Sequence, residues 1–497
     1  MKGQGRLLKE LIDGVGMMKR TLPAKSWLLA SAALLAPLFA QTLITKPASA
    51  ETLIEAMSMA YQGNPNLLAA RSALRAIDEE VPQALSGWRP TLTVNGTMTN
   101  NRNENQIFSG GGVGQVVTGG TTNRFQKQAN AQFTQPIFRG FRTVAGTSQA
   151  KNQVFAQRAR LQATEASVLL QVATAYFDVL QYQAVVDLSS NNVQVLSRQL
   201  DATNDRFRVG ELTRTDVAQS EAVLAGARAS LVQAEGQLQQ ARAAYTNVVG
   251  KAPENLQPPM LPANLPASFD AVIAAASSNN PNFIAADFTA KAAEDNVTVV
   301  QGELLPSVNL VGQYSRGWNT VADSSKSETV IAQAQVTVPI YQQGAEYSRL
   351  RQAKHSAGQS RYSADQAKLD ARNLATQAWE TYQSTTASIQ SFQSQISANE
   401  IALEGTQREA EVGSRTVLDV LNAEQFLLNS RVSLVRSQRD QFVAAHQLLA
   451  AVGILTGSGM GVSGPIYDPT AHFNDVQYQA FGAGVDIVRP SNSARGP

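Results

Sequence analysis

The segment VGELTRTDV at residues 209–217 returns as VGSRTVLDV at residues 412–420, at the same interval that separates Pro136 from Pro339. This interval of 203 residues is several times longer than the unit of a solenoid, which spans about 20 to 50 residues. The features that recur are turn and strand signals rather than catalytic residues. The chain is therefore predicted to be a tandem duplication of one structural half.

Each copy of the segment interrupts a long helical stretch. Proline is absent from residues 137–252 and 340–464, which are rich in the helix-favouring residues Ala, Gln and Arg. Gly210 and Gly413 can supply the left-handed residue that ends a helix. The Thr-x-x-Asp after each glycine resembles a capping box, which starts the next helix. Each half is therefore predicted to contain a helical hairpin with a tight tip. The predicted hairpins span residues 140–250 and 343–453.

Apolar residues recur at heptad spacing inside the hairpins. In the first arm they are Val172, Val179, Val186, Val193, Leu200 and Phe207. A sustained repeat of seven predicts coiled-coil packing. An arm of about 70 residues would be roughly 100 Å long, which is too long for a globular core.

The sequence between the helical stretches alternates apolar and polar residues, which predicts strands with one apolar face. The predicted strands lie at about 91–100, 125–137, 306–316 and 328–340. Four such strands of about ten residues fit the pattern of transmembrane β-strands. They cannot close on themselves, and unpaired edges are not tolerated in lipid, so several chains are expected to share one sheet. Three copies would supply twelve strands and leave room for a lumen, whereas the eight strands of two copies would leave almost none.

Residues 1–50 have the pattern of an export signal, with basic residues before the apolar stretch 27–40 and a small-x-small site at 48–50. Cleavage is expected after Ala50, and Met18 is an alternative start. The other possibility is an uncleaved membrane anchor, but the apolar stretch is short for a span. The predicted organisation is a signal at 1–50, repeats at 51–253 and 254–456, and a tail at 457–497.

Composition excludes several classes of function. The chain has no cysteine, which rules out disulfides, thiol catalysis and cysteine metal sites. Its three histidines are too scattered to predict a metal site. Residues 1–50 carry a net charge of +5, so their removal changes the formal charge from +2 to −3, which argues against nucleic acid as a partner. No nucleophile with a nearby base is found, so the protein is predicted not to be an enzyme and to need no cofactor or metal.

The order of short helix, strand pair, long helix, tight tip and returning helix, all twice, resembles the TolC family of outer-membrane efflux channels over residues 51–455. The resemblance implies an α+β membrane protein with a tandem-duplicated TolC-like fold. In this fold a homotrimer forms a 12-strand transmembrane β-barrel continuous with a periplasmic α-helical coiled-coil barrel. The tail, with Tyr467-Asp468-Pro469 and His472, is similar to those of alphaproteobacterial members of the BepC type.

The resemblance also implies roles for the two tips. Asp419 matches an aspartate that, repeated in three chains, forms a cation-selective ring at the periplasmic entrance; the alternative role is to cap the helix that begins near Thr416. Arg415 matches a basic residue that links to the aspartate of the first tip, here Asp216, and holds the entrance shut. The alternative is a pair of solvated charges. The positions expected to dock an adaptor, which also form the turns, are Gly210, Leu212, Thr213, Gly413, Ser414 and Thr416.

Three functions are compatible with these features. The leading hypothesis is the outer-membrane channel of a tripartite efflux system, a passive exit duct for toxic, relatively hydrophobic compounds. Its expected partners are a periplasmic adaptor protein, an inner-membrane transporter and outer-membrane lipid. The first alternative is the duct of a type I protein-secretion system. The second, from another class, is a trimeric coiled-coil surface adhesin, although such adhesins place their membrane strands together at the C-terminus.

Overall fold

The structure is a computed structural model that describes residues 51–109 and 116–484. The predicted signal at 1–50, the glycines at 110–112 and the tail after residue 484 lie outside the described residues. Within the described part, none of the helices combines the length and hydropathy that a membrane span requires.

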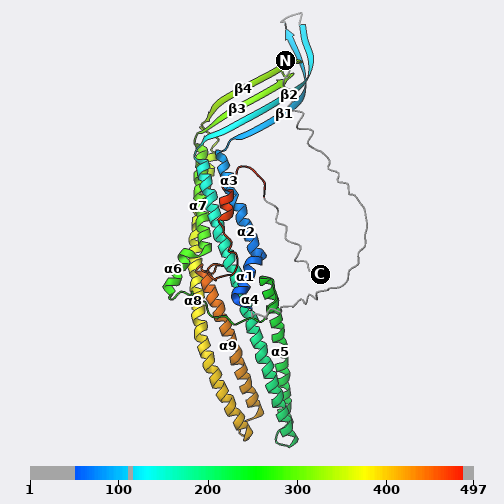
Figure 1. The fold of residues 1–497 in the computed structure, drawn as a ribbon, viewed down its shortest axis with the longest axis vertical. Coiled ribbons are helices and arrows are strands. Elements are labelled where there is room, and N and C mark those ends of the chain that lie inside the picture. Colours follow the sequence, from blue (N-terminus) through cyan, green and yellow to red (C-terminus); the bar gives the residue numbers. More distant parts are fainter. Residues whose placement is uncertain (1–50, 110–115, 485–497) are drawn as a thin grey trace, which may run out of the picture. The chain divides into compact units, whose positions relative to one another are not determined.

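The described chain contains nearly the same series of elements twice (Figure 1). The first half consists of α1 (Leu53–Gly63), α2 (Pro65–Asp78), α3 (Glu80–Leu85), η1 (Ser86–Trp88), β1 (Thr91–Ser109), β2 (Val116–Arg139), α4 (Arg142–Arg208) and α5 (Arg214–Val249). The second half consists of α6 (Phe269–Asn279), α7 (Pro281–Gln301), η2 (Gly302–Leu304), β3 (Ser307–Trp318), β4 (Lys326–Thr337), α8 (Ala345–Glu411) and α9 (Val417–Ala451). One helix, α7, stands in the second half in place of α2 and α3. A short helix, α10 (Ala471–Val476), follows in the tail. The predicted duplication is confirmed.

The two halves use one asparagine in the same way. Asn64 caps α2 and Asn280 caps α7, each directly before a proline that starts the helix. The Asn64 amide donates to the carbonyl of Val248 at 3.1 Å, and the Asn280 amide donates to the carbonyl of Ala451 at 3.0 Å. In each half the start of one helix is thereby tied to the end of the returning helix of the hairpin.

The four strands form one antiparallel sheet in the order β1-β2-β3-β4. Two strands are longer than alternation predicts, because β1 continues to Ser109 and β2 already begins at Val116. Their added residues are mostly polar or glycine and pair through the backbone, which apolar alternation cannot detect. β4 ends at Thr337 rather than at residue 340, since Pro339 has no N–H to donate.

Register places most apolar residues of the four strands on one face. One row across the sheet joins Leu92, Phe133, Gly312 and Ala332, and the next joins Val94, Ala131, Tyr314 and Val330. The other face carries Asn, Gln and Thr along β1 and β2. Leu92, Val94 and Val330 are each more than 70% exposed in the single chain, so this apolar face needs a cover.

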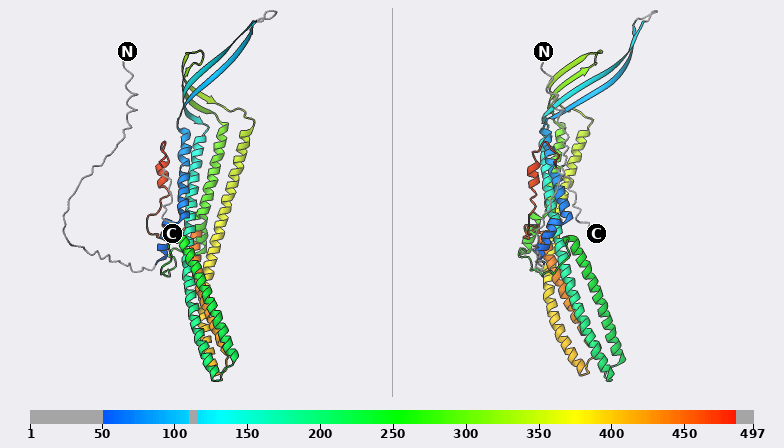
Figure 2. Two further views of the ribbon diagram at one scale, coloured as in Figure 1. Left: turned by 90° about the vertical axis from the view of Figure 1, so that its right-hand side faces the viewer. Right: turned by 45° about the vertical axis from the view of Figure 1, so that its right-hand side comes forward.

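The long helices α4 and α8 each have 67 residues, a length of about 100 Å. Each lies beside its returning helix, α5 or α9 (Figure 2). Val172 and Val179 of the predicted heptads are buried, whereas Phe207 near the tip is 41% exposed. The heptad pattern therefore describes the helix centre better than its end.

The main core surrounds the middle of α4, where α1, α5 and α9 pack against it. Glu51 is buried there, pairs with Leu256 as a parallel bridge, and accepts the Tyr245 hydroxyl on Oε1 at 2.6 Å. The Tyr176 hydroxyl donates to the Glu51 carbonyl at 2.8 Å. Burial raises the pKa of Tyr176 to about 12. The residue after the predicted cleavage site thus anchors the linker between the two halves.

The duplication supplies a matched pair of glycines for a stability test. Gly250 and Gly453 follow equivalent helices with φ of 89° and 76°. A methyl group at Gly250 would meet no atom within 4 Å, but at Gly453 it would overlap the Asn279 carbonyl oxygen. We expect Gly250→Ala to cost about 1 kcal/mol through its left-handed backbone, and Gly453→Ala to cost about 2 kcal/mol more through overpacking. Equal losses in chemical denaturation would contradict the predicted overlap.

Candidate functional site

The candidate site comprises the two helical tips, which lie at the ends of α4 and α8 that are remote from the sheet (Figure 1). Gly210 and Gly413 have φ of 85° and 80°, the left-handed conformation that glycine adopts without strain. In each tip the amide after the glycine donates back to the last helical turn, at 3.0 Å in the first tip and 2.9 Å in the second. The predicted helix stops are confirmed.

A capping box starts the returning helix of each hairpin. The amide and hydroxyl of Thr416 donate to Asp419 Oδ2 at 2.9 and 2.8 Å, and the Asp419 amide donates to the Thr416 hydroxyl at 3.2 Å. Thr213 and Asp216 form the same arrangement, with distances of 2.9, 2.7 and 3.3 Å. Both predicted capping boxes are confirmed, and both aspartates are therefore held in fixed positions.

These hydrogen bonds keep the two aspartates ionised. The amide and hydroxyl of Thr416 lower the pKa of Asp419 below its ordinary 3.8. The hydroxyl and amide of Thr213 do the same for the pKa of Asp216. Each tip therefore carries a negative charge near neutral pH, whether or not that charge has a function beyond the cap.

Arg415 has a different partner from the one that the resemblance implies. Its Nε lies 2.9 Å from Glu409 Oε2, and this hydrogen bond raises the pKa of the guanidinium above its ordinary value. Asp216 has no ion pair in the part of the chain that the structure describes. One chain alone does not bring Arg415 and Asp216 together.

The first tip holds an equivalent ion pair with its charges reversed. Arg206 Nε lies 3.0 Å from Glu211 Oε2, and Arg206 is the repeat equivalent of Glu409. The loop of the first tip is therefore acidic and the loop of the second, with Arg415, is basic. Each loop charge is already paired with an opposite charge of its own tip, and such exposed pairs are weak.

The predicted docking positions lie at the surface of the tips, and one of them is half-buried. The exposed positions are Gly210, Thr213, Gly413, Ser414 and Thr416. Leu212 packs against an apolar cluster instead. Its buried members are Leu196 and Leu224 of the first hairpin and Val417 and Leu421 of the second. This cluster joins the two hairpins near their tips. Leu196, Val417 and Leu421 stand outside the heptad pattern of the sequence, so periodicity does not predict this contact.

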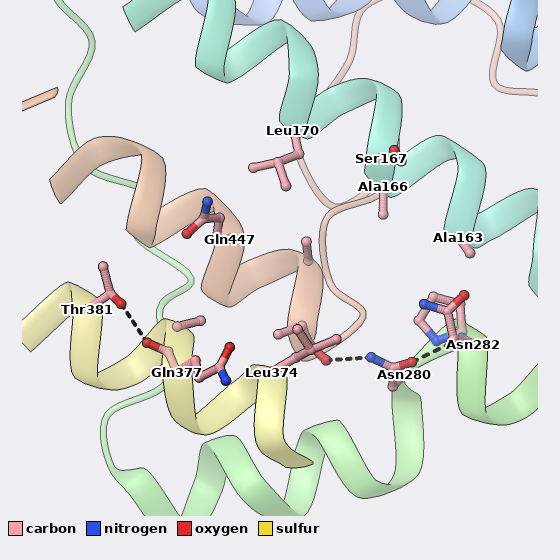
Figure 3. Close-up of a pocket in the computed structure, with 14 residues that line it drawn as sticks. Ala163, Ala166, Ser167, Leu170, Asn280, Asn282, Leu374, Gln377, Thr381 and Gln447 are labelled. Atoms are coloured by element: carbon pink, nitrogen blue, oxygen red, sulfur yellow. Dashed lines mark hydrogen bonds between the residues drawn. The ribbon is translucent and has the colours of Figure 1, made fainter. Parts of the chain in front are cut away.

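A cavity of about 470 Å³ lies between α4, α8, α9 and the start of α7 (Figure 3). Its wall is formed mostly by Ala, Gln, Asn and Leu side chains and contains no acidic, basic or imidazole group. Asn280 lies in it with its amide already bonded to Ala451. This cavity offers no acid or base for chemistry.

The sequence matches a known family over most of its length. The pattern of the family described as "Outer membrane efflux protein" matches residues 56–251 and 272–454. The "Outer membrane efflux protein BepC" of Brucella suis biovar 1 (strain 1330) is 34% identical over 450 residues, which cover 90% of this chain and 95% of that protein. The "Outer membrane protein TolC" of Escherichia coli (strain K12) is 25% identical over 429 residues, covering 82% and 83%.

A solved structure has the same fold. The Campylobacter jejuni CmeC outer membrane channel superposes with a TM-score of 0.71 at 15% sequence identity. The match covers 92% of this chain and 98% of that one. At this identity the likeness concerns the fold alone.

Proposed function

Because the chain belongs to the outer membrane efflux protein family, we propose that it is the exit duct of a tripartite system for toxic, relatively hydrophobic compounds. The protein is an outer membrane efflux channel that extends into the periplasm, and its family is not enzymatic. Beyond membership of this family, we propose two further properties: assembly into a tripartite system, and toxic, relatively hydrophobic compounds as substrates. The name of the Brucella relative, an efflux protein, supports the choice of efflux.

The observation that carries the assembly is the open sheet. β1 and β4 each have a strand neighbour on one side only among the described residues. An unpaired strand edge in lipid leaves backbone groups without hydrogen bonds, at several kcal/mol per group. Copies of the chain remove these edges by pairing β1 of one with β4 of the next. Three copies give twelve strands around a lumen, which makes the homotrimer the proposed unit.

The tips are the proposed entrance from the periplasm. Six positions there are proposed to dock the adaptor, which connects the duct to the inner-membrane transporter. They are Gly210, Leu212, Thr213, Gly413, Ser414 and Thr416. Asp419 is proposed to form the cation-selective ring, and Asp216 with Arg415 of a neighbouring tip to form the closing contact. The opposite charges of Arg415 and of Asp216, whose pKa is lowered by its capping hydrogen bonds, support this contact.

Deletion of the gene tests the substrate class. We expect the deletion strain to become sensitive to hydrophobic toxicants and the reintroduced gene to restore resistance. The set of secreted proteins is measured in parallel. Loss of a secreted protein with unchanged resistance would support the type I secretion duct instead. The adhesin would be supported if the deletion strain kept both its resistance and its secreted proteins, and if the purified protein opened no pore in planar bilayers.

A further inference from the structure

The apolar face of the sheet carries cations on the side remote from the helices, where β3 ends and β4 begins. Register aligns Met98, Lys127, Trp318 and Lys326 in one row across the four strands. Arg316 lies on the same face, one row nearer the helices. Lys127, Arg316 and Lys326, here called the cationic cluster, are all exposed.

The cationic cluster has aromatic neighbours but no carboxylate partner. Lys127 Nζ lies 5.4 Å from the ring centroid of Phe125, and Arg316 Cζ lies 5.4 Å from that of Trp318. Within residues 51–109 and 116–484, none of the three cations forms an ion pair. Glu328 stands opposite Arg316 in register, but it accepts the hydroxyl of Tyr314 at 3.1 Å. The cluster is therefore open to an external anion.

The opposite face of the sheet has no such cluster. The row beside Lys127 consists of Thr97, Gln128, Gly317 and Ser327, which are all neutral. Farther along β1, Arg102 and Glu104 share the apolar face and offset each other in charge. The cationic cluster thus lies on the face that needs an apolar cover, and the opposite face carries no cation in the row beside it.

The position of the cationic cluster indicates that lipid covers the apolar face. This step rests on the proposed function. The helices extend into the periplasm, and β1 and β2 join the helices at Thr91 and Arg139. The cationic cluster lies farther from the helices, where β3 ends and β4 begins, while β1 and β2 continue past it. This position places it at the outer boundary of the membrane. Aromatic side chains favour this boundary, and long basic side chains reach from it toward headgroups.

We propose that the cationic cluster binds the phosphate groups of lipids in the outer leaflet. Neighbouring strands are about 4.8 Å apart, so Lys127 and Lys326, two strands apart, are separated by roughly 10 Å. Trp318 lies between them and contacts the lipid below the headgroup. Hydrogen bonds from cations to phosphate are charge-assisted and are strengthened next to apolar surface. Three copies of the chain repeat the site around the duct.

The test compares phosphorylated and dephosphorylated lipid A as probes for the full-length protein in non-ionic detergent. Native mass spectrometry counts the lipids that each assembly retains. We expect wild type to bind phosphorylated lipid A at least about tenfold more tightly than the dephosphorylated form, since each cation near a charged surface contributes roughly fivefold. The K127Q/R316Q/K326Q variant should lose this preference and retain the dephosphorylated lipid as wild type does.

Arg124 provides the matched control, because it lies on the same strand as Lys127 but on the opposite face. Lys127→Gln should weaken retention of phosphorylated lipid A, and Arg124→Gln should not. Equal losses in the two variants, or a triple variant that still prefers the phosphorylated lipid, would overturn the proposal. Bilayer conductance is recorded on the same samples. A conducting wild type without phosphate preference refutes the lipid site alone, whereas a wild type that does not conduct refutes the proposed duct.

Discussion

Replacement of Arg415 by serine is expected to raise the resting conductance of the channel by up to roughly a hundredfold. The proposed contact with Asp216 of a neighbouring tip exists only in the closed entrance, so its loss shifts the population toward the open state. An exposed ion pair changes an equilibrium by about fivefold at most. Three such contacts in one assembly multiply to roughly a hundredfold. Single-channel recording in planar bilayers measures the change.

The structure adds a control that the sequence did not offer. Arg415 pairs with Glu409 of its own chain at 2.9 Å, so Arg415→Ser breaks that pair as well. Glu409→Gln breaks only the pair within the chain and should leave the conductance low. Asp216→Ala should open the channel as Arg415→Ser does, and the double variant should add little, because both remove one interaction. Opening by Glu409→Gln, or additive effects of Arg415→Ser and Asp216→Ala, would mean that the two residues do not form the gate.

Asp419→Asn is expected to weaken block by a trivalent cation by about tenfold or more. Three carboxylates converging on a narrow entrance create a potential that a single solvated carboxylate does not. Asparagine keeps a side-chain oxygen that can accept from Thr416, so the cap is largely retained while the charge is lost. Block is measured as the cation concentration that halves the conductance.

The pH dependence of the block follows from the capping hydrogen bonds. They lower the pKa of Asp419 below 3.8, so the carboxylate stays charged down to that pH and below. Block should therefore be lost at a lower pH than it would be for an uncapped aspartate at the same position, as the pH falls through the pKa of Asp419. The capping contribution to stability should be lost over the same range.

Asp216→Asn is the matched control, since Asp216 occupies the same capping box in the other tip. It removes an equivalent charge at an equivalent cap. Unchanged block in Asp216→Asn together with weakened block in Asp419→Asn would assign the ring to Asp419. Unchanged block in both variants would leave Asp419 as a helix cap only.

Local patterns in the sequence determined the parts of the fold that depend on neighbouring residues. A capping box involves residues three apart, so Thr416 and Asp419 could be paired without knowledge of the fold. A glycine that ends a helix acts through its own backbone, which made both tips predictable at Gly210 and Gly413. The alternation of apolar and polar residues located the four strands. The recurrence of these signals at a fixed interval revealed the duplication. These features need no information about which distant segments meet.

Contacts between distant segments were decided only by the tertiary structure. The partner of Arg415 depends on how the chain turns at the tip, and an exposed arginine has several carboxylates within reach. The cluster of Leu196, Leu224, Val417 and Leu421 joins hairpins about two hundred residues apart in the sequence. The row that aligns Lys127 with Lys326 depends on the register of two strand pairs, and a slip of one residue would move either lysine to the opposite face. Such choices are settled by packing and pairing over the whole chain, because many alternatives share the same local pattern.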